Sequence, residues 1–170
     1  MSTLSRDFDR LEIGDRFCSS GRTITETDLV SFAALTGDFH PLHTDAEWAQ
    51  ASEFEGRIAH GMLLLSYSVG LVPLDPAHVL ALRGFERVAF KRPVRIGETI
   101  RVEGELKEKK ELDGASGLAT FEWKIVNQRD ETAAIARVRV VWRRAVERAE
   151  EPEPAAQDES PAAERQEVYL

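Results

Sequence analysis

The fold follows from the stretch Gly61-Met62-Leu63-Leu64-Leu65-Ser66-Tyr67-Ser68-Val69-Gly70. In a helix these residues would place apolar side chains on nearly every side, and a helix that is apolar all round is buried in a core. The longest mainly apolar segment, Gly61 to Leu74, has 14 residues, whereas a membrane-spanning helix needs about 20. We therefore predict a buried helix over 61–70, around which the rest of one domain packs, and no membrane segment.

The residues that follow alternate between polar and apolar side chains, which is typical of half-buried strands. An interruption of the alternation between Ile135 and Val138 predicts a β-bulge. An early strand around Asp15 to Thr25 would complete the sheet. The sequence thus predicts an α+β domain in which an antiparallel sheet curls around the buried helix. The four later strands are predicted over Arg83–Phe90, Thr99–Lys107, Leu118–Asn127 and Thr132–Trp142.

Two further helices are predicted before the buried one. Thr25 is a good N-cap, and the acidic Glu26 and Asp28 fall in the first turn, where the helix dipole favours negative charge. This helix should end at Gly37, and a second short helix is expected over Ala46–Ala51.

The composition changes after Arg144. The chain has 170 residues, with 22 basic and 30 acidic side chains and a net charge of −8. Residues 145–170 are rich in acidic residues, proline and alanine, and such a segment cannot bury enough apolar surface to offset its ordering entropy. We predict one domain over residues 1–144 and a disordered acidic tail over 145–170.

Charge and cysteine content exclude some classes of function and indicate where the protein works. An acidic chain lacks the clustered Lys and Arg of a nucleic-acid footprint. The single cysteine, Cys18, cannot form an internal disulfide, and the polar segment Met1–Arg10 has no apolar core like that of a signal peptide. These observations predict a cytoplasmic protein. The open edge of a small curled sheet invites pairing with another chain, so we expect a homodimer.

The segment Gly37-Asp38-Phe39-His40-Pro41-Leu42-His43-Thr44-Asp45 carries the first candidate site. Pro41 stiffens the segment and keeps His40 out of helical geometry. Asp38 and His43 can then be held in a fixed relation on a loop, where a carboxylate and an imidazole that share one water act as a general acid/base pair. The alternative interpretation is that Asp38 caps a helix and His43 is a partly buried residue with its hydrogen bonds satisfied.

The segment Arg57-Ile58-Ala59-His60-Gly61-Met62 carries the second candidate site. Gly61 begins the buried helix, so its amide is unshielded by a side chain at the positive end of the helix dipole. Such an amide suits a carbonyl oxygen on which negative charge develops, as in an oxyanion hole. Close packing of Gly61 against the sheet would explain the glycine equally well.

Taken together, the two segments resemble the MaoC-like dehydratases, relatives of the R-specific enoyl-CoA hydratases. The resemblance rests on Gly37-Asp38-x-x-Pro41-Leu42-His43-x-Asp45 followed by Ile58-Ala59-His60-Gly61-Met62, with Phe90–Thr99 similar to their strand-turn region. It covers roughly residues 8–144. Two positions depart from the family pattern: His40 stands where asparagine is usual, and Val69 stands where a helix serine is often found.

The resemblance implies a hotdog fold, in which a sheet wraps a long helix, assembled as a dimer. Asp38 and His43 would activate water, and Gly61 would donate its amide to the thioester carbonyl of the substrate. The reaction would be reversible syn addition of water to a trans-2-enoyl-CoA or acyl-carrier thioester, giving a 3-hydroxyacyl product with R configuration where the family precedent holds. It would require no cofactor and no metal.

Three other functions stay open at this point. A thioesterase of this fold usually carries a carboxylate on or beside the central helix, and residues 61–70 have none. A metal site is chemically possible from carboxylate and imidazole ligands. A non-catalytic binding or assembly subunit would be consistent with the departures at His40 and Val69. The candidate metal ligands are Asp38, His40, His43 and His60.

Overall fold

The computed structural model describes residues 4–145, which form one antiparallel sheet and several helices. The strand order is β1-β4-β5-β6-β3, and β2 also pairs with β4. The strands are β1 (Arg16–Cys18), β2 (Arg22–Thr23), β3 (Val79–Phe90), β4 (Thr99–Glu111), β5 (Ser116–Asn127) and β6 (Thr132–Arg143). The helices are a 3-10 turn (Phe8–Arg10), α1 (Glu26–Thr36), α2 (Pro41–Thr44), α3 (Ala46–Gln50) and α4 (Gly61–Leu71).

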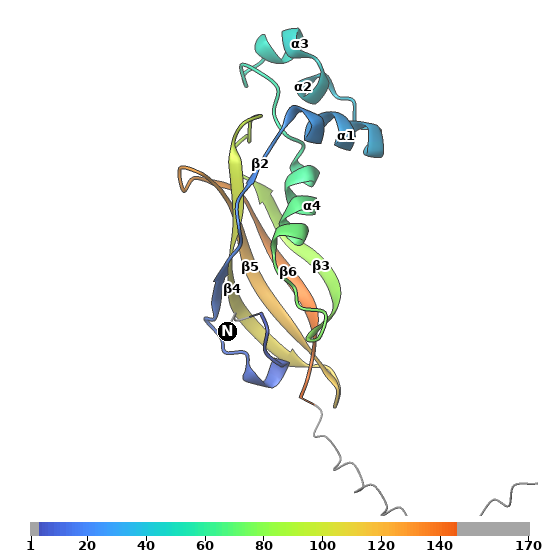
Figure 1. The fold of residues 1–170 in the computed structure, drawn as a ribbon, viewed down its shortest axis with the longest axis vertical. Helices are drawn as coiled ribbons and strands as arrows, with labels where there is room; N and C mark the ends of the chain where they lie inside the picture. The colour runs from blue at the N-terminus through green and yellow to red at the C-terminus, as the bar shows by residue number, and fades with distance from the viewer. Residues whose placement is uncertain (1–3, 146–170) are drawn as a thin grey trace, which may run out of the picture.

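The predicted buried helix is α4, and the sheet curves around it (Figure 1). Its Leu63, Leu64 and Leu65 join the main core, which the inward side chains of β4, β5 and β6 complete. Trp123 of β5 and Trp142 of β6 are fully buried there. The prediction of a buried helix over 61–70, packed inside a sheet formed by the later strands, is therefore confirmed.

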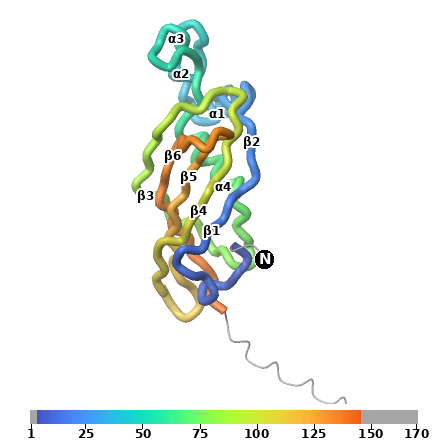
Figure 2. Tube along the Cα trace, turned by 90° about the vertical axis from the view of Figure 1, so that its left-hand side faces the viewer, coloured from blue at the N-terminus to red at the C-terminus, as the bar shows by residue number. Residues whose placement is uncertain are grey.

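Helices α1, α2 and α3 gather at one end of the sheet, beyond the strand ends, whereas the 3-10 turn lies at the other end (Figures 1 and 2). Thr25 caps α1 as predicted, in a capping box with Asp28. Gly37 ends α1 with a φ of 76°, a left-handed conformation that glycine adopts without strain. The chain then turns sharply into α2 and α3, which brings the Asp38–His43 segment next to the start of α4.

Three local expectations need correction. His43 lies in the single-turn helix α2 and not on a loop, because Pro41 occupies the first helical position, where its fixed φ suits a helix. The early strand is two short strands, β1 and β2, that both pair with β4.

The bulge predicted in β6 between Ile135 and Val138 lies in the facing strand β3 instead: Glu86 and Ala89 pair with Arg137 and Ile135, so β3 carries one residue more than β6 there. Buried and less buried residues alternate regularly from Ala134 to Trp142, and Ile135 simply lies on the outer face. The β5–β6 register shift falls earlier, between Ile125 and Val126, opposite the start of β6.

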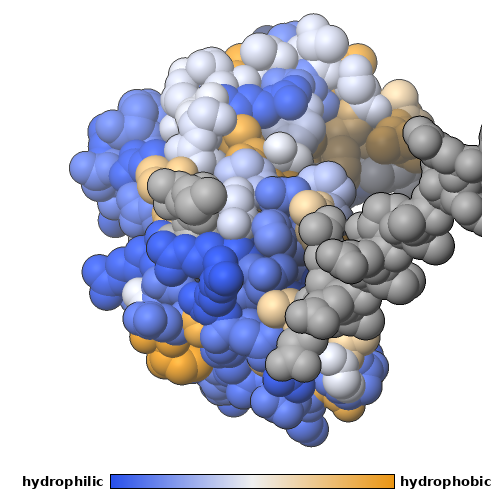
Figure 3. All heavy atoms as spheres, turned by 60° about the horizontal axis from the view of Figure 1, so that its bottom comes forward, coloured by the Kyte–Doolittle hydropathy of each residue, from blue (hydrophilic) through white to orange (hydrophobic). Residues whose placement is uncertain are grey.

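From residue 146 onward, the predicted acidic tail lies outside the described residues. Within residues 4–145, no helix is long and apolar enough to cross a membrane. The end of the molecule opposite α1–α3 is mostly hydrophilic, with small separate apolar patches (Figure 3).

A buried carboxylate ties α1, β2 and α4 together. The Tyr67 hydroxyl of α4 donates a hydrogen bond to Oδ1 of Asp28, and Arg22 forms a 3.0 Å ion pair with the same oxygen. The Arg22 guanidinium also lies 3.7 Å from the Tyr67 ring centroid. Thr25 donates to the other oxygen from its backbone amide and hydroxyl. Burial by itself raises the pKa of Asp28, but these donors outweigh burial and lower it to about 2.

This cluster predicts an acid-dependent loss of stability. Asp28 has a pKa of about 2 in the folded state against 3.8 ordinarily, so its ionised form favours folding by about 2 kcal/mol. That stability is fully present above pH 4 and is lost as the pH falls towards 2. In urea unfolding between pH 5 and 2, the wild type should therefore lose about 2 kcal/mol more than Asp28→Asn. Parallel curves for the two proteins would contradict the assignment.

Candidate active site

A pocket of about 390 Å³ lies where α2, the start of α4 and the end of β3 meet. Its walls combine polar groups from the 38–61 segment with apolar side chains and two basic residues. The lining comprises Asp38, His43, Phe54, Ile58, Ala59, His60, Gly61, Met62, Leu64, Phe90, Lys91, Arg92, Pro93 and Val94. The sequence-predicted site residues Asp38, His43 and Gly61 therefore all lie in one pocket.

Asp38 directly follows the left-handed Gly37 and is exposed. Its Oδ1 accepts a 3.3 Å hydrogen bond from the backbone amide of His40. That bond holds one carboxylate oxygen against the turn, and Asp38 is among the residues that line the pocket. The alternative that Asp38 is a helix cap does not hold, since Gly37 is the C-cap of α1 and His40 is the N-cap of α2.

His43 is half-buried, and a main-chain carbonyl determines which of its two ring nitrogens carries the proton. Its Nδ1 lies 2.8 Å from the carbonyl oxygen of Ile58. A carbonyl can only accept, so Nδ1 carries the proton, and Nε2 of the neutral ring is left as an acceptor. Burial lowers the pKa of His43, the hydrogen bond to Ile58 raises it, and the net shift is downward. His43 is thus a neutral imidazole with a free lone pair near pH 7.

His60 is a residue that sequence reasoning placed only in the second motif and among possible metal ligands. It is 2% exposed, and its Nε2 lies 3.1 Å from the main-chain oxygen of Asp38. Its ring stacks on His43 with centroids 3.8 Å apart and planes 28° apart. On the sequence, its place between apolar Ala59 and the first residue of the buried helix was the signal for a buried polar role.

The polar atoms of Asp38, His43 and His60 lie within 4.8 Å of one another, a spacing that would admit a metal ion. The near-parallel stack of the two rings opposes this use. Imidazole lone pairs lie in the ring plane, so those of stacked rings run side by side and do not converge on one ion. His40, the fourth candidate, uses Nδ1 to accept from the Leu42 amide and packs edge-on against Trp48.

Gly61 is the first residue of α4 and faces the ring of Phe90. A Cβ built on Gly61 would lie 2.6 to 2.8 Å from the outer carbons of that ring, closer than real contacts allow. The close-packing interpretation of this glycine is therefore correct. It does not compete with a role for the amide, because the first N–H groups of a helix have no partner within the helix and suit an oxygen that gains negative charge.

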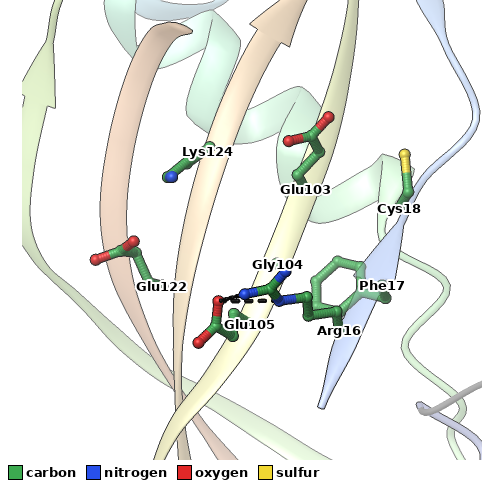
Figure 4. A pocket seen from close by; sticks show the side chains of 8 residues that line it. All are labelled: Arg16, Phe17, Cys18, Glu103, Gly104, Glu105, Glu122 and Lys124. Atoms are coloured by element: carbon green, nitrogen blue, oxygen red, sulfur yellow. Dashed lines mark hydrogen bonds and ion pairs between the residues drawn. The ribbon is translucent and has the colours of Figure 1, made fainter. Parts of the chain in front are cut away.

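A second and larger pocket, of about 450 Å³, lies on β1, β4 and β5. It shares no lining residue with the histidine pocket, and its charged side chains include an ion pair between Arg16 and Glu105 at 3.0 Å (Figure 4). Its lining has neither an imidazole nor a helix N-terminus, so it does not combine an imidazole–carboxylate pair with a helix amide as the histidine pocket does. The lining residues are Arg16, Phe17, Cys18, Glu103, Gly104, Glu105, Glu122 and Lys124.

Comparison with known proteins identifies relatives of this chain. Residues 11–124 match the family described as MaoC like domain. Protein MaoC of Klebsiella aerogenes is 39% identical over 103 residues, which make up 60% of this chain but only 31% of that protein. The chain thus spans about a third of that relative. The (R)-specific enoyl-CoA hydratase of Aeromonas caviae is 35% identical over 110 residues, 65% of this chain and 81% of that protein.

Solved structures show the same fold. An Archaeoglobus protein described as a monoamine oxidase regulatory protein superposes with a TM-score of 0.79 at 39% identity, covering 83% of this chain and 96% of that one. A Mycobacterium tuberculosis protein with a double hotdog fold gives 0.74 at 18% identity, covering 96% of this chain and 54% of that one. The chain therefore has the hotdog fold, as the sequence predicted.

Proposed function

The chain belongs to the MaoC-like dehydratase family, which includes named hydratases and dehydratases, and from this premise we propose that it reversibly hydrates a trans-2-enoyl thioester. The substrate would be carried on CoA or on an acyl carrier protein. The observation that carries the proposal is the meeting of Asp38, His43 and the start of α4 in one pocket. Addition of water next to a thioester carbonyl needs an acid/base pair and a donor to the carbonyl oxygen, and we assign the first role to Asp38 with His43 and the second to the amide of Gly61.

In the proposed reaction, Asp38 and His43 hold one water between the carboxylate and the Nε2 lone pair. The water oxygen bonds to C3 of the substrate while the pair takes up one of its protons. The C2=C3 electrons move towards the thioester carbonyl, and the amide of Gly61 stabilises the oxygen that gains charge. The proton is then delivered to C2, so that one water is added overall and the pair returns to its starting state.

Turnover of crotonyl-CoA, followed by loss of the enone absorbance, tests the proposal. The purified protein should hydrate it, or a longer or branched enoyl-CoA, at a rate well above the uncatalysed reaction. Release of free thiol in place of hydration would indicate a thioesterase, although α4 carries no carboxylate. Failure of every enoyl thioester in such a panel would contradict the proposal and favour a non-catalytic subunit.

We also propose that the protein is a homodimer joined along β3. Among the described residues 4–145, this strand is at the edge of the sheet and pairs only with β6, and its Leu80 and Leu82 are 43% and 41% exposed. A second copy would pair the open edge and cover these side chains. In sedimentation velocity, Leu82→Glu should shift the protein to monomer. Leu112→Glu, at an equally exposed leucine in the β4–β5 turn, should not, and equal behaviour of the two variants would contradict this interface.

A further inference from the structure

We propose that His60 is a positioning residue that holds the ring of His43 and the main chain of Asp38 in one arrangement. The inference rests on the proposed function and adds a third residue to its site. His60 lies directly before Gly61, so a single dipeptide would both order the water-activating pair and present the amide to the carbonyl.

The contacts of His60 reach both members of the pair. Its Nε2 donates to the main-chain oxygen of Asp38 at 3.1 Å, since a carbonyl can only accept. One face of its ring lies against His43 at 3.8 Å, and Phe32 of α1 packs nearby with its centroid at 5.1 Å. The ring is therefore fixed by packing and by one hydrogen bond, and the two groups that it touches are the two that share the proposed water.

The burial of His60 also leaves one of its ring nitrogens without a partner. Within residues 4–145, its Nδ1 is buried and has no hydrogen-bond partner. With Nε2 hydrogen-bonded to Asp38, the ring offers no further polar contact and faces His43 through its flat side.

The unpartnered Nδ1 of His60 lowers the stability of the folded protein. Measurements of stability can therefore distinguish a positioning role of His60 from a purely structural one. A buried acceptor without a partner destabilises the folded state, so an apolar ring of similar size should fit the site at least as well. Replacing His60 by an apolar ring would remove the donor to the main-chain oxygen of Asp38. Asp38 is exposed, so this oxygen can bond to water instead. A structural role predicts that activity and stability fall together, whereas positioning predicts that activity alone falls.

Two single variants test the hydrogen bond and the ring stack of His60 separately. His60→Phe keeps a flat ring against His43 but removes the donor to Asp38, whereas His60→Gln keeps a donor at the Nε2 position but removes the ring. Each should lower kcat for enoyl-CoA hydration roughly 10- to 100-fold, because small displacements of reacting groups are this costly. KM should stay within about twofold, and the Tm of His60→Phe should equal or exceed that of the wild type. His78→Gln, at a histidine outside the pocket that pairs with Asp7, is the matched control.

A readout independent of turnover is the ¹⁵N spectrum of the His43 ring. The wild type should show the Nδ1–H form, and His60→Gln should raise the pKa of His43 towards its ordinary value, because water replaces the stacked ring. The other titratable groups near His43 are Asp38 and His40, which both variants retain. Unchanged kcat and an unchanged His43 spectrum in both variants would overturn the proposal.

The spectrum also separates this inference from the proposed function. If the wild type hydrates no enoyl thioester, an altered His43 ring in the variants still supports positioning of the pair, and an unaltered one overturns it. If kcat and Tm of His60→Phe fall together while the His43 spectrum stays the same, His60 is structural and the inference is wrong.

Discussion

Asp38→Asn should lower kcat for crotonyl-CoA hydration by about 10²- to 10⁴-fold, the usual contribution of a general acid or base. The amide cannot take up a proton from water. It has the size of the carboxylate and can still accept the bond from the His40 amide, and the side chain is exposed, so the fold should be preserved. The rate is measured from the enone absorbance, and folding is checked from the Tm.

The chain offers a close control for this variant. Asp45 lies in the same segment, outside the pocket, and caps α3 by accepting from the Trp48 amide. Asparagine caps helices as well as aspartate does, so Asp45→Asn should leave kcat nearly unchanged. His43→Ala should lose as much activity as Asp38→Asn, and the double variant little more, because residues that act as one unit are not additive. Equal activity of Asp38→Asn and wild type would remove Asp38 from the mechanism.

Removal of the Gly61 amide should lower kcat by about 10²- to 10³-fold, the usual loss for one oxyanion donor. Gly61→Pro removes only this N–H from the backbone. Proline is favoured at the first position of a helix, and His60 already has φ −60° and ψ 138°, the region adopted before proline. The Phe90 ring would clash with any side chain at this position, so the change is made in a Phe90→Ala background.

Gly61→Ala in the same Phe90→Ala background is the matched control, since alanine keeps the amide. Its kcat should lie within a few-fold of Phe90→Ala alone, whereas the proline variant should fall far below both. Equal rates for the alanine and proline variants would show that the amide of residue 61 does not contact the substrate. In that case Gly61 serves only the close approach of Phe90.

Local patterns determined the elements of this protein. The apolar stretch 61–70, the cap at Thr25 and the left-handed stop at Gly37 act within a few residues of the chain, so the sequence predicts them correctly. The strands of the later half follow in the same way from alternation. The bulge expected in β6 near Ile135 lies in the facing strand β3, between Glu86 and Ala89, because side-chain alternation along one strand does not report which of two paired strands carries the extra residue.

Two sequence motifs predicted the candidate site, but only the tertiary structure joined its parts. Asp38 and His43 lie close in sequence, and their pairing with Gly61 came from a resemblance. The stack of His60 on His43 and the ring of Phe90 over Gly61 link residues that are 17 and 29 positions apart. Contacts of this kind depend on how α2 and β3 pack against the start of α4, which no local preference encodes. The sequence therefore determined which groups are present, and packing decided how they are oriented and protonated.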